Sequence, residues 1–551
     1  DGATWLWHRL NTWQRVVAIG VLALCTAPWV YLVVAELSVI EALILLGLVP
    51  LVTGILPAAF GRWINLVWVI ALLLLGAGGA LVSDTFANGA AMLFMLVAGA
   101  IIVFFLWVIF CVHPPASVEK DKTDLLATPE TQRAVQAALS HTDGVYAGDV
   151  GGEPLFTSLE DRACVIGPPG TGKTTFMVNQ LLRWAETQRP FVCLDIKPEI
   201  EGLVREQLVE LGYRIRVFNP TQTGHDRYNP FDDIEGPEGL GELAASLIPS
   251  EGAEHAVFNE SARDLLDAMA SHLKAQQRKK RKGQGATLPA VRSLLESAND
   301  PAALLGQLSN SPDKAVRGIA RGLSMTGANE RLMGSIIATF RSNLRFLRYP
   351  NISESVSTSD FSLKDLTTDR PVALFLQFEE AHRDTTKDLM SAMVAHLMRY
   401  LIIHTDRSPV LLLLDEIGNA PAVPGLIQKL NTIRSRKLPT WLYWQSLEQM
   451  QRYGAKAGEG ANIILGACDL QMVFRLNDNA SAEWVSQRIG TVDRLIKSRS
   501  VSEGTVTDSR SLREEPVIFS HELQQLKQSE VIGVYREHRW RGMAKPYHQL
   551  L

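Results

Sequence analysis

The feature that most constrains the fold of this chain is a glycine-rich stretch, Gly167-Pro-Pro-Gly-Thr-Gly-Lys-Thr174. A short β-type run, Arg162–Ile166, comes directly before it, and a helical segment over 175–184 comes directly after it. The pattern GxxxxGK[ST] between a strand and a helix is typical of a P-loop. Its glycines let backbone N–H groups turn toward phosphate oxygens, and the helix adds the positive end of its dipole. The sequence therefore predicts nucleotide binding on an α/β fold.

The P-loop side chains have distinct expected roles. Lys173 is expected to reach the β- and γ-phosphates, and the Thr174 hydroxyl is expected to bind Mg²⁺. A chance match in a glycine-rich turn is the alternative, and the flanking strand and helix argue against it. The predicted nucleotide-binding residues are Gly167, Pro168, Pro169, Gly170, Thr171, Gly172, Lys173, Thr174 and Thr175.

A pair of carboxylates adds what hydrolysis requires beyond nucleotide binding. Pro409–Leu414 is a continuous apolar run, as expected of a central parallel strand that is covered on both faces, and it ends in Asp415 and Glu416. Asp415 is placed to hold the Mg²⁺ shell, and Glu416 to position and polarise the attacking water. Together with the P-loop, this pair predicts an ATPase that uses ATP and Mg²⁺.

Further β-type runs alternate with helical segments along the chain. The runs are 191–196, 215–218, 372–378, 440–444, 470–474 and 531–535, and helices are predicted over 128–139, 384–404 and 480–489. Alternation of this kind predicts a doubly wound, mostly parallel α/β sheet. The fold expected is a RecA-like P-loop motor.

Two polar positions outside the motifs are further candidates. Gln445 follows the predicted strand 440–444 at the sheet edge where such folds bind ligands, so it can sense the γ-phosphate; a surface glutamine is the alternative. Arg434, ahead of Arg436, is a candidate arginine finger that completes the site of a neighbouring subunit. A solvated helix end remains the other interpretation of these two arginines.

The middle of the chain has a different pattern. Residues 235–355 are mostly helical, with predicted helices over 240–247, 257–273, 287–297, 301–309, 315–322 and 330–347. We interpret this part as an all-α domain inserted in the motor. It contains the basic run 278–282, which is expected to be a solvated loop, with contact to DNA phosphates as the alternative.

The N-terminal part is almost entirely apolar. Four uncharged or nearly uncharged runs, 16–35, 42–60, 63–82 and 89–112, have about the length needed to cross a hydrocarbon core. The basic residues before the first run, between the second and third, and after the fourth indicate that both ends face the cytoplasm. The join between the first two runs is short, so two spans or a re-entrant pair are alternatives to four. Beyond this part, residues 113–140 are expected to begin as a linker.

Charge and cysteine content restrict the remaining possibilities. The net charge of −4 and the pI near 6.4 exclude a broadly basic nucleic-acid coat. The five cysteines are scattered without a CxxC pair, which indicates packed, reduced thiols.

Several less common pieces, in this order along the chain, resemble the type IV secretion coupling proteins, the TraG/TraD-type ATPases of bacterial conjugation. Asp195-Ile-Lys-Pro-Glu199 is similar to the family's second-strand motif, with Pro198 in place of a glycine. The others are Phe218-Asn-Pro220, Tyr228-Asn-Pro-Phe-Asp232, Trp444-Gln-Ser446 with Gln449 and Tyr453-Gly454, and Asn477-Asp478 leading to Ala482-Glu483 and 486–490. The resemblance covers essentially the whole chain.

The resemblance implies a hexameric motor of the bacterial inner membrane, in contact with the lipid bilayer and with type IV secretion channel components. Its cargo is expected to be a relaxase with single-stranded DNA, or else effector proteins. It also implies the finger role for Arg434 and the sensor role for Gln445. The expected division is a transmembrane domain (1–115), a nucleotide-binding domain in two parts (116–234 and 356–551) and the inserted domain (235–355).

Two other function classes are alternatives for this chain. A septal double-stranded DNA translocase also carries spans ahead of a RecA-like hexamer, but its P-loop differs and the chain after Val531 is too short for its winged-helix tail. An interaction platform with a structural nucleotide does not need the intact set of Lys173, Thr174, Asp415 and Glu416.

Overall fold

The structure is a computed structural model, and it describes residues 117–120, 124–249, 256–280, 285–298, 300–326, 330–368, 370–419, 422–454, 456, 458–502 and 505–547. The chain divides into two compact units. One comprises Asp1–Asp121 with Arg494–Arg513, and the other comprises Lys122–Asp493 with Glu514–Leu551. Each unit is described on its own below.

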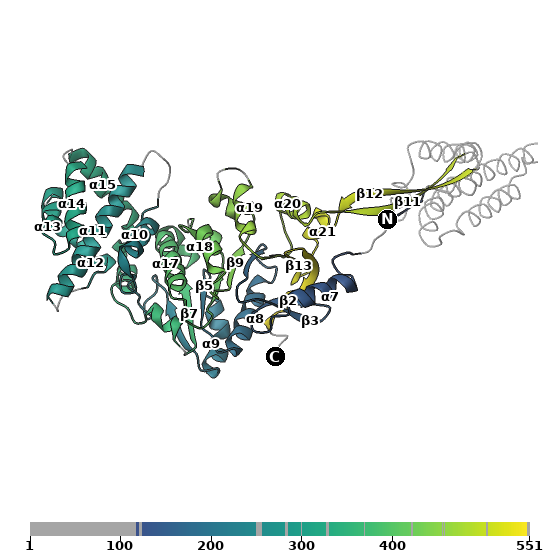
Figure 1. The fold of residues 1–551 in the computed structure, drawn as a ribbon, viewed down its shortest axis with the longest axis horizontal. Coiled ribbons are helices and arrows are strands. Elements are labelled where there is room, and N and C mark those ends of the chain that lie inside the picture. Colours follow the sequence, from purple (N-terminus) through teal and green to yellow (C-terminus); the bar gives the residue numbers. More distant parts are fainter. Residues whose placement is uncertain are drawn as a thin grey trace, which may run out of the picture. The chain divides into compact units, whose positions relative to one another are not determined.

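The larger unit is built on an 11-stranded sheet with the order β3-β2-β14-β13-β10-β4-β9-β8-β5-β7-β6 (Figure 1). From β10 to β6 all neighbouring strands are parallel, whereas β10 and β13, β13 and β14, β14 and β2, and β2 and β3 pair antiparallel. The parallel strands are β10 (Leu470–Val473), β4 (Arg162–Ile166), β9 (Thr440–Trp444), β8 (Leu411–Leu414), β5 (Phe191–Asp195), β7 (Val372–Gln377) and β6 (Arg214–Phe218). The others are β13 (Glu530–Tyr535), β14 (His538–Met543), β2 (Val145–Val150) and β3 (Glu153–Thr157). The predicted mostly parallel α/β sheet is confirmed.

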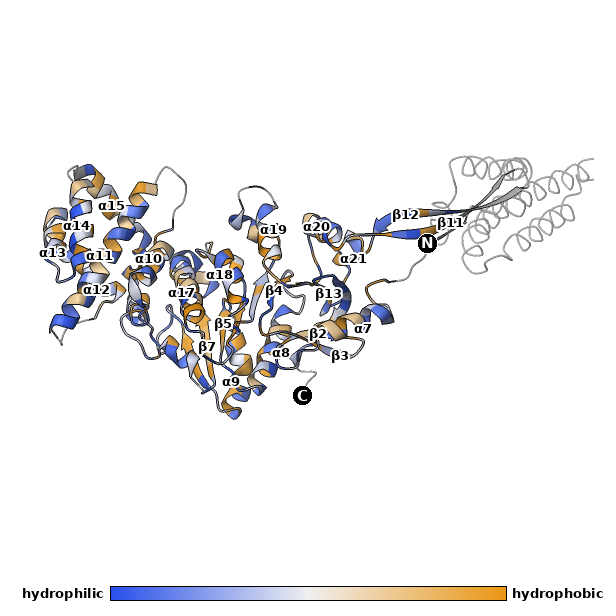
Figure 2. Ribbon diagram, in the orientation of Figure 1, coloured by the Kyte–Doolittle hydropathy of each residue, from blue (hydrophilic) through white to orange (hydrophobic). Residues whose placement is uncertain are grey.

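Both faces of the central strands are buried, because side chains alternate between them. In β8, Leu412 and Leu414 belong to one hydrophobic cluster, and Leu411 and Leu413 belong to the other. Burial of each leucine stabilises the fold by about 2 kcal/mol relative to an exposed position. Figure 2 shows β5 and β7 in the colours of hydrophobic residues.

Helices cover the two faces of the sheet. Apolar residues of α8 (Lys173–Glu186) and α9 (Ile200–Glu210) belong to the cluster on one face. Apolar residues of α17 (Arg383–Ile403) and α18 (Leu426–Ile433) belong to the cluster on the other. Figure 1 shows these two pairs on opposite sides of the strands. The remaining helices outside the segment between β6 and β7 are α7 (Pro129–Ala138), α19 (Glu459–Gly466), α20 (Asn479–Ile489) and α21 (Ser520–Gln524).

The chain between β6 and β7 is helical, as the sequence predicts. It contains α10 (Gly236–Leu247), α11 (Ala256–Lys280), α12 (Leu288–Ser297), α13 (Pro301–Ser309), α14 (Lys314–Thr326), α15 (Glu330–Asn343) and α16 (Pro350–Ser355). The interpretation of the basic run as a loop is wrong for its first three residues, because α11 continues through Lys280. Positive side chains are favourable near the C-terminal end of a helix, where they face the negative end of its dipole.

In the smaller unit, β1 (Ser117–Lys120), β11 (Thr491–Ser502) and β12 (Thr505–Pro516) form a separate sheet in that order. The β1 strand pairs antiparallel with β11, Ser117 facing Arg499. The linker expected after the apolar runs therefore contains a strand. The four predicted spans lie outside the described residues; among the helices that the structure describes, none has the length and apolar character to cross a membrane.

Candidate functional site

The predicted P-loop joins β4 to α8 at the carboxyl edge of the parallel strands. The N–H of Gly167 donates to the carbonyl of Trp444 (3.1 Å), which ties the start of the loop to the end of β9. Gly170 and Gly172 have φ values of +78° and +103°. Only glycine adopts this conformation without strain, so both positions serve the turn of the backbone.

The loop is closely packed by neighbouring strands where it passes them. A Cβ on Gly167 would lie 2.7 Å from the Cβ of Phe474, and a Cβ on Gly172 would lie 2.8 Å from the hydroxyl of Ser529. The N–H of Ser529 donates to the carbonyl of Thr171 (3.1 Å). Residues that follow β10 and precede β13 therefore restrict the conformation of the loop.

Lys173 is buried at the start of α8, and its ammonium group donates to the carbonyl of Gly167. Burial lowers the pKa of this lysine, while Asp415 and Glu416 raise it and so oppose that effect. A cation held inside a glycine loop, beside the N-terminus of a helix, fits the β- and γ-phosphates of a nucleotide. The sequence assignment of Lys173 agrees with this geometry.

Asp415 and Thr174 are the predicted magnesium ligands, and this assignment stays a prediction. Asp415 follows β8 and is buried, and its N–H donates to the carbonyl of Leu194 (3.2 Å). Burial, and next the charge of Glu416, raise the pKa of Asp415 to about 7, while Lys173 lowers it. Among the described residues no group of three or more His, Cys, Asp and Glu could hold a metal. Magnesium does not require such a group, since one or two side-chain oxygens, water and phosphate oxygens suffice.

Glu416 is the centre of a polar cluster formed by three strand ends. Its carboxylate accepts a hydrogen bond from the side-chain amide of Gln445 (2.8 Å) and lies 3.4 Å from the ammonium of Lys197. Glu416 has a φ of +45°, which is uncommon for a residue with a side chain and is found at functional sites. The N–H of Gln445 donates to the side chain of Gln449 (3.0 Å), which holds Gln445 in place. The contact between Gln445 and Glu416 was not predicted from the sequence, and the γ-phosphate sensor role of Gln445 stays a prediction.

Arg434 does not join this cluster within one chain. It is exposed at the C-terminal end of α18, before β9 begins. In the parallel pair of β9 and β4, Thr440 at the start of β9 lies opposite Arg162 at the start of β4. Arg434 comes shortly before β9, so it lies near the amino ends of these strands. The P-loop lies at their carboxyl ends. The carbonyl of Leu430 in α18 accepts a hydrogen bond from Arg162 (2.9 Å), in agreement with this position. The finger role of Arg434 therefore stays a prediction.

One turn of the site was not assigned a role from the sequence. The residues between β5 and α9 place Lys197 beside Glu416, and they place Glu199 beside Thr174, whose hydroxyl donates to the Glu199 carboxylate (3.5 Å). The sequence held a signal for this turn, because it follows a predicted strand of the parallel sheet. The carboxyl ends of neighbouring parallel strands, here β5 and β8, meet at one edge of the sheet.

Comparison with known proteins agrees with this architecture. The family described as type IV secretory system conjugative DNA transfer matches residues 119–538. The chain belongs to this family.

Curated relatives of this member of the family include two from Escherichia coli, both named conjugal transfer protein TraG. Each is 25% identical to it, one over 400 residues and 67% of this chain, the other over 398 residues and 66%. The chain spans 62% and 61% of the length of these relatives.

Solved structures similar to it include the bacterial conjugative coupling protein TrwB. An unbound form, TrwBdeltaN70, has a TM-score of 0.55 and 15% identity, over 77% of this chain and 91% of the chain in that structure. A complex of TrwB with ADP and Mg²⁺ also has a TM-score of 0.55 and 15% identity, over 79% of this chain and 96% of that one. At this level of identity the likeness establishes a shared fold.

The sequence pieces that carried the family resemblance have structural contacts here. In the conjugative transfer signature after β6, the hydroxyl of Tyr228 contacts Asp233 (3.1 Å) and the ring of His396 (3.0 Å). The side-chain amide of Asn229 donates to Asp232 (2.8 Å) and to the carbonyl of Ala286 (2.9 Å). This signature therefore attaches the helical segment to the motor.

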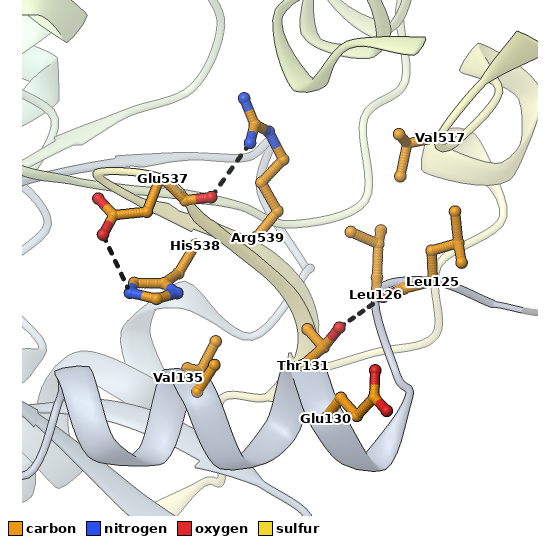
Figure 3. Close-up of a pocket in the computed structure, with 10 residues that line it drawn as sticks. Leu125, Leu126, Glu130, Thr131, Val135, Val517, Glu537, His538 and Arg539 are labelled. Carbon is orange, nitrogen blue, oxygen red and sulfur yellow. Dashed lines mark hydrogen bonds and ion pairs between the residues drawn. The ribbon is translucent and has the colours of Figure 1, made fainter. Parts of the chain in front are cut away.

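A separate pocket of about 390 Å³ lies between α7 and the turn from β13 to β14 (Figure 3). Its walls include Leu126 and Val135, and its rim includes the Glu537–His538 pair (3.5 Å). In the register of the sheet, the turn at His538 is level with the amino ends of β10 and β4, the edge opposite the P-loop. This pocket is not part of the nucleotide site.

Proposed function

We propose that this chain is an inner-membrane ATPase that couples ATP hydrolysis to transfer of a relaxase–DNA complex into a type IV secretion channel. The observation that carries the proposal is the adjacency of β4, β9 and β8, whose carboxyl ends bring together Lys173, Gln445 and the Asp415–Glu416 pair. This grouping supports hydrolysis of a phosphoanhydride, a reaction that needs a phosphate-binding cation, a metal ligand and a group that orients water.

The chemistry proposed is in-line attack of water on the γ-phosphate. Lys173 stabilises the negative charge of the phosphates, while Thr174 and Asp415 hold Mg²⁺, which offsets the charge that develops on the phosphate oxygens. Glu416 orients the water and attracts its proton. Gln445 holds the Glu416 carboxylate in place and responds to the γ-phosphate.

The site is proposed to be shared between subunits of a hexamer. Arg434 is exposed at the far edge of its own sheet, so it serves as a finger only for an adjacent copy. A truncated protein without residues 1–115 should hydrolyse ATP poorly until it assembles. Full activity of a strict monomer would contradict the shared site.

The remaining parts of the proposal rest on the family and on the apolar N-terminal runs. Residues 1–115 form the membrane domain, 116–234 and 356–551 form the motor, and 235–355 form the inserted domain. The apolar runs support a location in the inner membrane, with the motor in the cytoplasm. The cargo is a relaxase with single-stranded DNA; effector proteins are the second candidate, and co-purification from membranes distinguishes them.

The decisive experiment measures nucleotide binding and turnover of the purified full chain and two variants. Lys173→Ala should lose nucleotide binding, and Glu416→Gln should bind ATP but turn it over at least a hundredfold more slowly. Unchanged hydrolysis in both variants would remove the catalytic assignment.

A further inference from the structure

The turn between β5 and α9, residues Asp195–Glu199, forms a third side of the proposed nucleotide site. It contacts two of the assigned residues independently. Lys197 lies 3.4 Å from the Glu416 carboxylate, and Glu199 accepts the hydroxyl hydrogen of Thr174 at 3.5 Å. One short turn therefore meets both the proposed water-activating carboxylate and a proposed magnesium ligand.

The backbone of this turn is held in place by a buried carboxylate. One oxygen of Asp195 accepts the N–H of Ile200 (3.2 Å) and the side-chain amide of Gln377 (3.3 Å). Asp195 is fully buried at the end of β5, so it caps the start of α9 and limits movement of the turn. The side chain of Lys197 extends from a rigid base.

The Lys197 side chain itself has room to move. It is 42% exposed, whereas the Glu416 side chain is 7% exposed. Its ammonium group also lowers the pKa of Lys173, so the two cations act on the same space. A long, half-exposed lysine that faces a buried carboxylate can exchange that partner for a stronger anion without rearrangement of the backbone.

We propose that Lys197 is a nucleotide-sensing residue of the ATPase reaction: it exchanges its pairing with Glu416 for contact with the γ-phosphate of a bound triphosphate. This inference rests on the proposed function. In the bound state Glu416 keeps Gln445 and loses its cation, which leaves its carboxylate to orient water. A diphosphate has no γ-phosphate and leaves the Lys197–Glu416 pair intact, so Lys197 links activation of Glu416 to the presence of ATP.

The test is a binding cycle on the full chain, with Mg²⁺, using ADP and a non-hydrolysable ATP analogue. Lys197→Met should weaken binding of the ATP analogue about tenfold and change the affinity for ADP less than twofold. Lys197→Arg should retain most of the affinity for the analogue. Lys364→Met is the matched control, because Lys364 is exposed in the segment before β7, at the opposite edge of the sheet. It should change neither affinity.

The second arm introduces Glu416→Gln into the wild-type chain and into the Lys197→Met variant. That substitution should tighten analogue binding more in the protein that keeps Lys197, since it releases the lysine as well as removing a negative charge. The proposal would be overturned if Glu416→Gln changed analogue binding equally in both proteins. It would also be overturned if Lys197→Met weakened the binding of ADP and of the analogue equally. A wild-type chain that binds neither nucleotide would instead overturn the proposed function, which is a separate outcome.

Discussion

The side-chain amide of Gln445 donates a 2.8 Å hydrogen bond to the carboxylate of Glu416. The two residues follow different strands, β9 and β8, which pair in parallel with Leu414 beside Leu442. The same carboxylate faces Lys197 from a third strand end. The proposed water-activating group is therefore held by its neighbours in the sheet.

Replacement of Gln445 should affect turnover more than binding. We expect Gln445→Ala to lower kcat by about 10- to 100-fold with little change in KM, because the hydrogen bond orients Glu416 during the chemical step. Steady-state ATPase kinetics measure this. Gln428→Ala, which changes an exposed glutamine of α18, is the control and should retain full activity. A Gln445→Ala protein with normal kcat would contradict the sensor role.

Mixing of subunits should test the role of Arg434. Lys173→Ala and Arg434→Ala proteins should each lose most ATPase activity, but a mixture of the two should regain part of it. Some interfaces then combine an intact P-loop with an intact finger from the neighbouring subunit. Activity as a function of mixing ratio is the measurement. If the mixture is no more active than its components, Arg434 does not act across subunits.

A buried charge cluster connects the inserted helices to the motor. Glu242 of α10 pairs with Lys429 of α18 and with Arg399 of α17 (3.1 Å). Lys429 is nearly fully buried, and its ammonium group also donates to the carbonyl of Pro424 (3.0 Å). We expect Glu242→Ala to reduce the free energy of unfolding by about 3 kcal/mol.

The measurement is denaturant unfolding, with Glu238→Ala as the matched control on the same helix. Glu238 is exposed and should change stability by about 0.5 kcal/mol or less. Equal losses in the two variants would show that the cluster does not contribute. A gain of stability in Glu242→Ala would contradict it directly.

Acid should destabilise the motor through His396. Burial lowers the pKa of His396 from 6.5 to about 4; Arg399 and Lys274 act in the same direction, while Asp233 and Glu242 oppose it. The unfolded chain therefore binds a proton that the folded chain does not, and stability falls as the pH drops from 6.5 toward 4. Between pH 7 and pH 5 this one group should cost about 2 kcal/mol.

Unfolding curves at several pH values of wild type and His396→Gln measure this contribution. The variant should lose less stability on acidification than the wild type. An identical pH dependence of wild type and His396→Gln would show that His396 does not titrate in this range.

Two of the strands that sequence reasoning missed, β11 and β12, have polar sequences. The β11 strand, Thr491–Ser502, mixes Asp, Arg, Lys and Ser with isolated apolar residues and lacks the run of apolar residues that predicted β8. Its backbone hydrogen bonds to β1 and β12 are what make it a strand. Pairing between segments this far apart leaves little trace in local composition.

The sequence by itself determined the strand–loop–helix of 162–186 and the leucine strand that ends in Asp415, because both depend on local backbone geometry and local hydrophobicity. Only the tertiary structure decided that Ser529 packs against Gly172 and that Lys197 and Gln445 meet at Glu416. Those contacts follow from the order of strands in the sheet. That order is set by how the helices cover the two faces, which no single segment of sequence encodes.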